Sequence, residues 1–482
     1  MKILLKTGFN ILLLFCSFKA FSLDASLRGY YPSFKEGDVV ELITSPYGSP
    51  DYTGFTKTYT TEIHNHSFRF VIQMEDAPLQ IVIHFKDKYG KLTWTDQYLA
   101  KAISGYYIES GDEISIFEKN KEVEYTGKGS SKFKLLQQVK AMGSKAFAPL
   151  GISFVENPFL NIKIADSLVK EQLAVVRENK HVLSDAIYTI YRANLIGAWI
   201  GLKYSVRYIA ESTRKRVIDS LRHATFQDPF SQRELTNINN SAYIIYADQY
   251  TRNIRSKYEF DSCYSSGREF SDHKYYLFLE RHYSGKLLER LITDILFRDR
   301  VEAGDNSDLI NDALSRIKNP DFRMVLNTLK NHRSPGADAF NFSLTDENGK
   351  MHTMEEFKGQ VVFLDFWFTG CGNCIQVKPY IDKLEDYFRN KPVSFLSVNL
   401  DKTKAEWLKS VQQGKYTTKL GMNLFTGGNA FDSAVSKYYS VDGGPTLILI
   451  NKLGKLMEIP LDPRADNGNN IKMLIDSELK LK

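Results

Sequence analysis

The sequence predicts a multidomain chain with an all-β N-terminal domain, a central α-helical domain and a C-terminal α/β domain. Three observations predict this order. At 482 residues the chain is too long to bury its apolar side chains in one core. Short strand-like runs give way to helical periodicity near residue 129, and strands and helices alternate beyond residue 333. We therefore place the domains at residues 23–128, 129–332 and 333–482, after a leader of residues 1–22.

The leader has the pattern of a secretory signal peptide. Lys2 and Lys6 form a basic start, residues 9–18 an apolar centre, and residues 20–22 a small-x-small cleavage site. Because the apolar part is too short to span a bilayer, we expect cleavage rather than anchoring, and no transmembrane segment in the mature chain. Export also implies an oxidising compartment.

Composition excludes some classes of function. The chain is 43% hydrophobic and 25% charged, which is typical of a globular protein. Removal of the leader takes away three lysines and no acids, so the net charge falls from +6 to +3 and indicates no nucleic-acid partner. Three cysteines would remain, too few for a disulfide framework. Two of them lie close together in the sequence, which favours a chemically active pair over a structural disulfide.

Residues 23–128 contain short β-branched or aromatic runs, for example "DVVELIT", "SFRFVIQM", "LQIVIHF" and "DEISIFE", separated by Gly, Pro, Asp and Asn. We expect a small antiparallel sandwich or barrel. His64 and His66 would share one face of a strand. We interpret them as solvent-facing rather than as a metal pair, because no further Cys or His clusters nearby.

Residues 129–332 carry apolar side chains at three- and four-residue intervals, which predicts paired antiparallel helices. The most apolar portion, residues 193–202, is half a membrane span long, so we expect a buried core helix. Cys263 lies in this region. A buried free thiol is the expected state, with regulatory or intermolecular pairing as the alternative.

Beyond a turn-forming linker at residues 333–336, strands and helices alternate, as in a parallel or mixed sheet with helices on both faces. We expect strands at residues 340–344, 351–353, 361–368 and 393–400, a terminal hairpin of residues 446–451 and 455–460, and helices opening near residue 374 and covering residues 404–413, 429–438 and 470–481.

Cys371 and Cys374 are the chemical centre of this domain. Cys371 follows a predicted strand, and Cys374 lies one helical turn later. At a helix N-terminus, free N–H groups and the helix dipole stabilise a thiolate. Such a pair can form a mixed disulfide and then resolve it. The alternatives are half of a zinc site, which lacks a second pair of ligands, and an inert bridge, which would close too small a loop to stabilise much.

The stretch "PGADAFNFSLTDENGKMHTMEEFKGQVVFLDFWFTGCGNC" resembles the TlpA/ResA-like thiol–disulfide oxidoreductases. The resemblance covers residues 333–482 and implies a thioredoxin-like fold. Asp365 matches a buried carboxylate that shuttles the resolving cysteine's proton, and Pro379 matches the proline that kinks the active-site helix. "GGPT" at residues 443–446 matches the cis-proline loop, so Pro445 would be cis and lie against the disulfide.

The resemblance implies a set of site residues. The catalytic ones would be Cys371, Cys374, Asp365 and Pro445. Those that contact substrate would be Trp367, Gly370, Gly444 and Thr446. It implies no metal and no cofactor apart from a redox-active Cys371–Cys374 disulfide.

Four positions depart from the family pattern. Gly370 replaces a Trp before the first cysteine, and Asn373 replaces a Pro between the two. Val377 stands where several members carry an acid, and Ser397 replaces the lysine that pairs with the buried Asp in thioredoxin. Proton handling would therefore depend mainly on Asp365. The direction of electron flow stays open.

The leading hypothesis is a periplasmic enzyme that exchanges electrons with client protein thiols or disulfides and with an upstream redox partner. Residues 23–332 are similar in architecture to the long N-terminal regions of Bacteroidetes-type envelope proteins, which implies client recruitment or a homodimer. One alternative is a thiol peroxidase, although Thr369 precedes Cys371 by only two residues and no peroxidase-type Pro is present. Another is a binding module with a vestigial redox domain.

Overall fold

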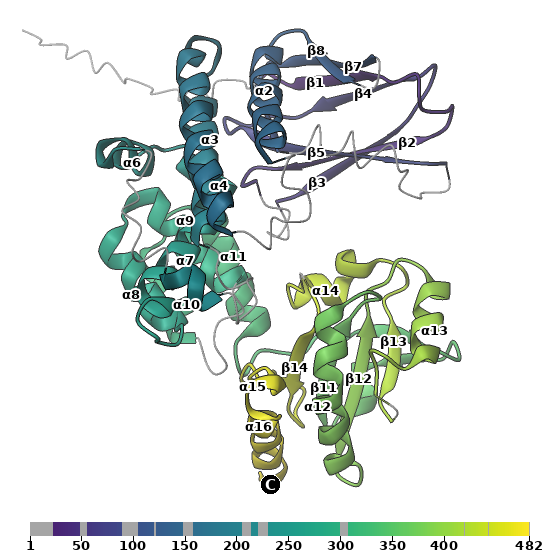
Figure 1. The fold of residues 1–482 in the computed structure, drawn as a ribbon. Helices are drawn as coiled ribbons and strands as arrows, with labels where there is room; N and C mark the ends of the chain where they lie inside the picture. Colours follow the sequence, from purple (N-terminus) through teal and green to yellow (C-terminus); the bar gives the residue numbers. More distant parts are fainter. Residues whose placement is uncertain are drawn as a thin grey trace, which may run out of the picture. The chain divides into compact units, whose positions relative to one another are not determined.

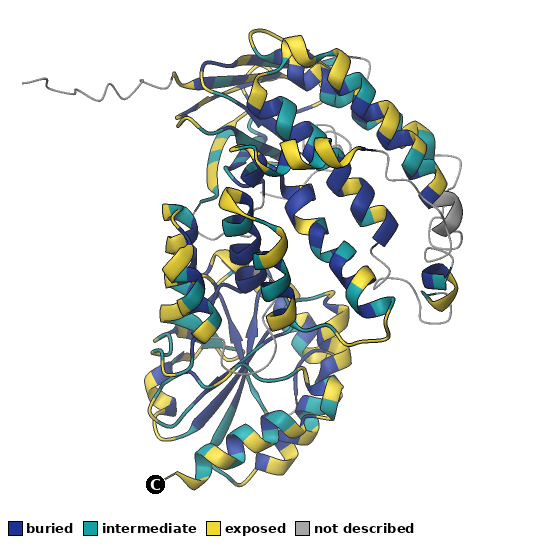
Figure 2. Cartoon of the chain, turned by 90° about the vertical axis from the view of Figure 1, so that its left-hand side faces the viewer, coloured by how far each residue is buried: buried dark blue, intermediate teal, exposed yellow. Residues whose placement is uncertain are grey.

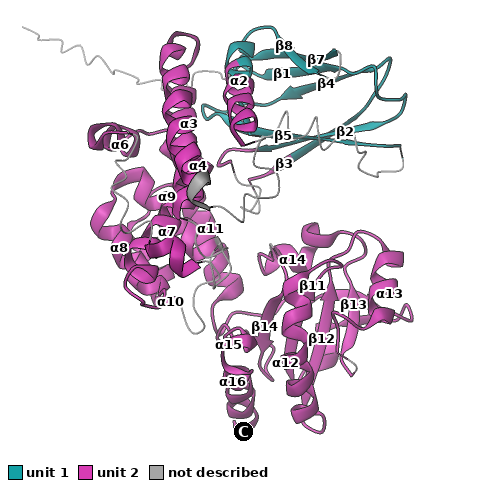
Figure 3. Ribbon diagram, in the orientation of Figure 1, with its two compact units in different colours: residues 1–44, 58–134 teal, residues 45–57, 135–482 magenta. Residues whose placement is uncertain are grey.

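The computed structural model describes residues 23–48, 55–88, 105–119, 122–147, 158–204, 214–219, 230–298, 307–418, 420–441 and 443–481 (Figure 1). The predicted signal peptide lies outside these residues. Figure 3 divides the chain into two compact units, one of residues 1–44 and 58–134 and one of residues 45–57 and 135–482.

The first unit contains two four-stranded sheets, with strand orders β4-β1-β7-β8 and β3-β2-β5-β6. Buried side chains alternate along the strands, and the rings of Phe68 and Phe85, one from each sheet, lie 5.9 Å apart in a shared core. The predicted β-sandwich is present. It is not wholly antiparallel, because β1 pairs in parallel with β7. The strands are β1 (Ala25–Tyr30), β2 (Val39–Ser45), β3 (Lys57–Glu62), β4 (Ser67–Ile72), β5 (Leu79–Lys86), β6 (Tyr106–Ile108), β7 (Glu113–Lys119) and β8 (Glu122–Thr126).

The two histidines of this unit lie in a turn, so the prediction that they share a strand face is wrong. His64 pairs with Ser67, and Asn65 and His66 have φ angles of 50° and 59°. A two-residue turn of this kind joins β3 to β4. His64 Nδ1 lies 2.8 Å from a carboxylate oxygen of Glu36. Among the described residues, no group of three or more His, Cys, Asp or Glu side chains could hold a metal ion.

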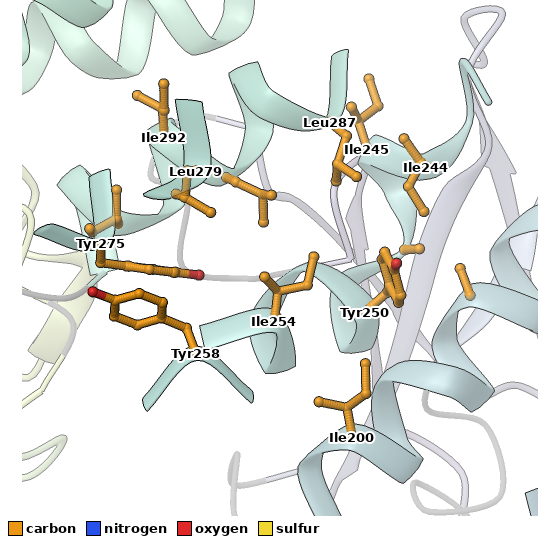
Figure 4. Close-up of a cluster of buried hydrophobic side chains, with 14 of the residues drawn as sticks. Ile200, Ile244, Ile245, Tyr250, Ile254, Tyr258, Tyr275, Leu279, Leu287 and Ile292 are labelled. Atoms are coloured by element: carbon orange, nitrogen blue, oxygen red, sulfur yellow. The ribbon is translucent and has the colours of Figure 1, made fainter. Parts of the chain in front are cut away.

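The helical part of the second unit has one continuous apolar core, part of which Figure 4 shows. Ile200, Ile254 and Leu279 come from three different helices of that core. As expected, residues 193–202 lie in a core helix, α4, which buries Ala193, Ile196 and Ile200 on one face and leaves Leu202 exposed. Within the described part of the chain no helix is both long and apolar enough to cross a membrane. The helices are α2 (Ser130–Phe147), α3 (Pro158–Glu178), α4 (Asp185–Tyr204), α6 (Gln232–Asn239), α7 (Asp248–Tyr258), α8 (Asp272–His282), α9 (Gly285–Arg298), α10 (Ser307–Arg316) and α11 (Pro320–Arg333), with short helical turns η2 (Lys180–Val182) and η4 (Ile244–Tyr246) and the π-helix η5 (Glu259–Tyr264).

Cys263 lies in η5 and is a buried free thiol, as the sequence predicts. Burial raises the pKa of this thiol, which disfavours the nucleophilic thiolate.

The C-terminal part of the second unit contains a six-stranded mixed sheet, with strand order β10-β9-β13-β12-β11-β14. β11 pairs in parallel with β12 and antiparallel with β14, so it lies inside the sheet. The elements are β9 (Ser343–Asp346), β10 (Met351–Thr353), η6 (Met354–Phe357), β11 (Val361–Trp367), α12 (Gly372–Phe388), β12 (Val393–Asn399), α13 (Lys404–Gln413), β13 (Met422–Phe425), η7 (Ala430–Asp432), α14 (Ala434–Tyr438), β14 (Thr446–Ile450), α15 (Pro463–Asp466) and α16 (Asn469–Lys480).

Two separate apolar layers cover this sheet, as alternation along β11 requires. Val361 and Phe363 face α12 and α16, whereas Val362 and Leu364 face the layer that includes α14. Figure 2 shows the strands of this sheet in dark blue and teal, that is, buried or partly buried, with exposed residues on the helices around it. The predicted α/β architecture with helices on both faces is confirmed.

Three local expectations differ from the structure. The four-residue strand β13 has no counterpart in the prediction, because it is too short for a periodic signal. The hairpin expected from residues 446–451 and 455–460 is present only in part: Leu456 pairs antiparallel with Ile450 as an isolated bridge, but Lys455 pairs with Asp338 and residues 455–460 form no second strand. The helix expected at residues 429–438 is broken into η7 and α14 by the extended Ser433, which caps the second helix.

The packing of α4 against α7 generates a stability prediction. A Cβ atom on Gly197 would lie 2.3 Å from backbone atoms of Gln249 and Tyr250. We expect Gly197→Ala to destabilise the chain by about 1–3 kcal/mol, because the backbone cannot move aside as a side chain would. Gly143→Ala in α2 is the control, since its nearest atom would be 3.7 Å away. The control should stabilise by up to about 1 kcal/mol. Denaturant unfolding monitored by far-UV circular dichroism measures both, and equal midpoints would contradict the close-packing argument.

Candidate active site

β11 ends four residues before Cys371, so the cysteine pair lies at the end of the sheet. All seven of its residues are buried, and a four-residue turn connects it to α12. Cys371 is the N-cap of α12, and its sulfur accepts a hydrogen bond from the backbone N–H of Cys374 at 3.1 Å. The two cysteines form a disulfide. Only 4% of Cys371 and 2% of Cys374 is exposed, so the pair lies just beneath the surface.

The turn before Cys371 is held by polar groups from outside α12. The backbone N–H and hydroxyl of Thr369 each donate to an Asp401 carboxylate oxygen at 2.7 Å. The N–H of Gly370 donates to the hydroxyl of Tyr416 at 2.9 Å. Gly370 has a φ of +91°, a left-handed conformation that disfavours any side chain. The predicted substrate-contact residue Gly370 is therefore exposed and conformationally constrained.

The loop before β14 packs directly on the disulfide. The Gly444–Pro445 peptide bond is cis, as the resemblance implies. A Cβ atom on Gly444 would lie 2.9 Å from the sulfur of Cys374 and 3.3 Å from that of Cys371, so only glycine allows this approach. Thr446 is buried, and its hydroxyl donates to the carbonyl of Gly443 at 2.7 Å. Thr446 therefore shapes the loop from within.

Asp365 lies in the interior on the face of β11 that α12 covers. It follows Phe363 by two residues and Val361 by four, so it shares the strand face of these two side chains, which pack against α12. Asp365 is 4% exposed, and its Oδ1 has no hydrogen-bond partner among the described residues. Burial raises the pKa of Asp365 to about 7. The residue opposite it on β12 is Ser397, so no cation at that position lowers this pKa.

Trp367 lies behind the cysteines rather than at the surface. Its side chain is fully buried, and its ring stacks on that of Tyr416 with centroids 5.1 Å apart. It shares an apolar cluster with both cysteines, Trp407 and Phe425. Trp367 is therefore covered by its own domain in this conformation and supports the cysteines from inside, and its contact with a substrate stays a prediction.

The family model "Redoxin" matches residues 334–473. The thiol-disulfide oxidoreductase ResA of Bacillus thuringiensis is 34% identical over 123 residues, which is 26% of this chain and 67% of that protein. The chain belongs to the ResA-like thiol–disulfide oxidoreductases. It is thus an oxidoreductase. ResA of Bacillus subtilis is also 34% identical, over 26% of this chain and 66% of its own length.

Solved structures are similar to about 30% of this chain. The thioredoxin domain of a thiol-disulfide oxidoreductase from Bacteroides vulgatus is 25% identical, with 29% of this chain and 98% of that chain covered and a TM-score of 0.26. A thiol:disulfide interchange protein from Bacteroides sp. is 25% identical, with 30% and 91% covered and a TM-score of 0.26.

Several residues of the oxidoreductase site were not predicted. Asp401 and Tyr416 hold the turn before Cys371, and Arg464 of α15 bonds to Asn373 between the cysteines. Asp401 could have been found, because it follows the carboxyl end of β12, a strand parallel to β11, where site residues gather in such sheets. Tyr416 and Arg464 carry no local signal.

The buried carboxyl of the oxidoreductase generates a pH prediction. The folded pKa of Asp365 is about 7, above its unfolded value near 3.8, so the folded protein binds the proton more tightly. Stability should therefore fall as the pH rises from about 4 to about 7. Asp365→Asn should remove this slope and raise stability at pH 8 by at most about 4 kcal/mol. Denaturant unfolding of the oxidised protein at pH 4.5 and pH 8 measures it. An unchanged slope in the variant would contradict the assignment.

The glycine of the cis-proline loop generates a second prediction. Gly444→Ala should displace the loop from the sulfurs and lower the rate of disulfide exchange about tenfold, which is about 1.4 kcal/mol in the barrier. The measurement is reduction of a small aromatic disulfide by the reduced enzyme in stopped flow. Gly143→Ala controls for a distant glycine. A wild-type rate for Gly444→Ala would mean that contact at this loop does not matter for exchange.

Proposed function

We propose that this enzyme exchanges electrons with disulfides of client proteins through Cys371 and Cys374. The main observation behind this proposal is the Cys371–Cys374 disulfide at the N-terminus of α12, which packs against the Gly444–Pro445 loop. A helix N-terminus stabilises a thiolate on Cys371, and the Cys374 N–H that now bonds its sulfur adds to this effect.

The reaction has two displacements in the reducing direction. The Cys371 thiolate attacks one sulfur of the client disulfide, so a mixed disulfide forms and the other client sulfur leaves as a thiolate. Cys374 then loses its proton and attacks the Cys371 sulfur, which releases the second client sulfur. The client gains two electrons, and the enzyme pair is oxidised to its disulfide. An upstream redox partner, a dithiol donor, then returns two electrons.

Asp365 is the candidate proton acceptor for Cys374. With a pKa of about 7, the carboxyl is partly protonated near neutral pH, so it can take a proton and return it. Its position on the α12 side of β11 and the lack of a partner for its Oδ1 within the described residues leave it available for this role.

The surface around Cys371 suits a polypeptide substrate. Gly370 and Gly372 flank it, are exposed, and leave open space where side chains would be. Ile375, one residue beyond Cys374, is 42% exposed and offers an apolar contact. The Gly444–Pro445 loop offers backbone groups to an extended client chain.

We place this activity in the periplasm or cell envelope, on the signal-like sequence of residues 1–22. The β-rich and helical parts would recruit clients or pair two copies of the chain. The redox-active disulfide would be the only redox group needed.

Trapping tests this function. In Cys374→Ser the second displacement is blocked, so we expect mixed disulfides with client proteins to accumulate through Cys371 in the native envelope. Non-reducing gels followed by mass spectrometry measure them. Cys263→Ser should be present in every variant, so that the remaining thiol cannot contribute.

The matched control is Cys371→Ser with Cys374→Ser, which should trap nothing. An empty trap in the single variant, together with no reduction of insulin by the wild-type protein, would contradict the proposal. Peroxide turnover without a thioredoxin-like partner would support a thiol peroxidase instead. An unchanged cellular role for Cys371→Ser would support a vestigial site.

A further inference from the structure

We propose that Arg464 is a positioning residue for the exchange at Cys371 and Cys374. It holds Asn373, and through it the first turn of α12, so that the Cys374 N–H stays directed at the Cys371 sulfur. This inference depends on the proposed function of the cysteine pair, and it concerns a residue 90 positions beyond that pair in the sequence.

The contacts of Arg464 connect α15 to α12. Its Nη1 donates to Asn373 Oδ1 at 3.1 Å and to Gln376 Oε1 at 3.0 Å. Its Nε donates to Asp462 Oδ1 at 3.0 Å, and its Nη2 donates to Asp462 Oδ2 at 2.6 Å. Nε and Nη2 of the guanidinium therefore bond to Asp462 in the same segment of chain, and Nη1 bonds to the first turns of α12, next to the cysteines.

Asp462 preorganises this arginine. Besides the ion pair, the carboxylate of Asp462 accepts the backbone N–H of Arg464 at 2.9 Å, as the N-cap of α15. The Arg464 and Asp462 side chains are 32% and 43% exposed, so the pair by itself adds little stability. The ion pair instead restricts the rotamers of the Arg464 side chain, so that its guanidinium points toward α12 and little conformational entropy is lost when it bonds Asn373.

The turn between the cysteines needs such a restraint. Gly372, its first residue, has no Cβ and the widest backbone freedom, and Asn373 is a residue type that favours turns over helix. Both are exposed, and nothing lies within 4 Å of the position a Gly372 Cβ would occupy. Arg464 supplies from α15 the rigidity that Gly372 and Asn373 do not provide locally.

The chemical consequence concerns the reduced state. With both sulfurs reduced, the Cys371 thiolate is stabilised by the Cys374 N–H, which is directed only while the first turn keeps its shape. A looser turn stabilises the thiolate less, so the thiol pKa of Cys371 rises and the disulfide becomes harder to reduce. The charged or titratable groups on the neighbouring elements include Asp365 on β11, Asp401 after β12, Tyr416 after α13, Asp462 beside Arg464, and Lys378 on α12, which pairs with Asp382 at 2.7 Å.

Three variants of the full-length Cys263→Ser protein, two single and one double, test this inference first. Arg464→Gln should shift the equilibrium with glutathione at least about threefold toward the disulfide, which is about 14 mV. It should also raise the apparent thiol pKa of Cys371, read from the pH dependence of alkylation. Asn373→Ala should change both quantities in the same direction, and the double variant should add little to either single one, because the two residues act through one contact.

Two further variants separate position from charge. Arg464→Lys keeps the positive charge but lacks the fork, so it should fail to restore wild-type values. Arg389→Gln removes an equal charge from the other end of α12, where Arg389 pairs with Asp386, and it should behave as wild type.

Three outcomes would overturn the inference while the wild-type protein reduces insulin. The first is an Arg464→Gln variant with unchanged equilibrium and pKa. The second is full rescue by Arg464→Lys, which would indicate charge alone. The third is an equal shift in Arg389→Gln. If the wild-type protein itself has no exchangeable Cys371–Cys374 disulfide, the proposed function fails instead, so the two failures are distinguishable.

Discussion

The burial of β11 inside the six-stranded sheet is the constraint on which the site depends. Strands on both sides and apolar layers on both faces leave its seven residues no freedom of position. Its end therefore presents the turn of residues 368–371 at one fixed place. The same burial acts on Asp365, whose pKa rises because the strand holds a carboxyl where water cannot reach it. Packing thus creates the chemical property as well as the geometry.

Two opposite requirements meet at the sulfurs, and glycine resolves each of them. The disulfide must be shielded, and Gly444 allows the backbone of its loop to approach within a distance that any side chain would block. The proposed exchange also requires that a partner can reach the disulfide, and Gly370 and Gly372 leave the space beside Cys371 open. The tight contact is therefore between the sulfurs and the Gly444–Pro445 loop, and the open space lies beside the two glycines that flank Cys371.

The cysteine turn is held by three distant segments. Asp401 follows β12, Tyr416 follows α13, and Arg464 belongs to α15. Each bonds to a different residue of the stretch from Thr369 to Asn373. The conformation of this turn is therefore a property of the whole C-terminal domain, and the Cys-Gly-Asn-Cys motif alone does not contain it.

The sequence by itself determined the strand or helix character of each region and predicted that Cys371 and Cys374 form a pair, because apolar periodicity and cysteine spacing are local patterns. It also indicated Asp365 and the Gly444–Pro445 loop, since the resemblance extends to those positions. The tertiary structure decided the buried position of Trp367, the turn that contains His64 and His66, and the pairing of the short strand β13. It also decided that Arg464 meets Asn373, because a contact across 91 residues of chain arises only when packing of the domain brings two segments together.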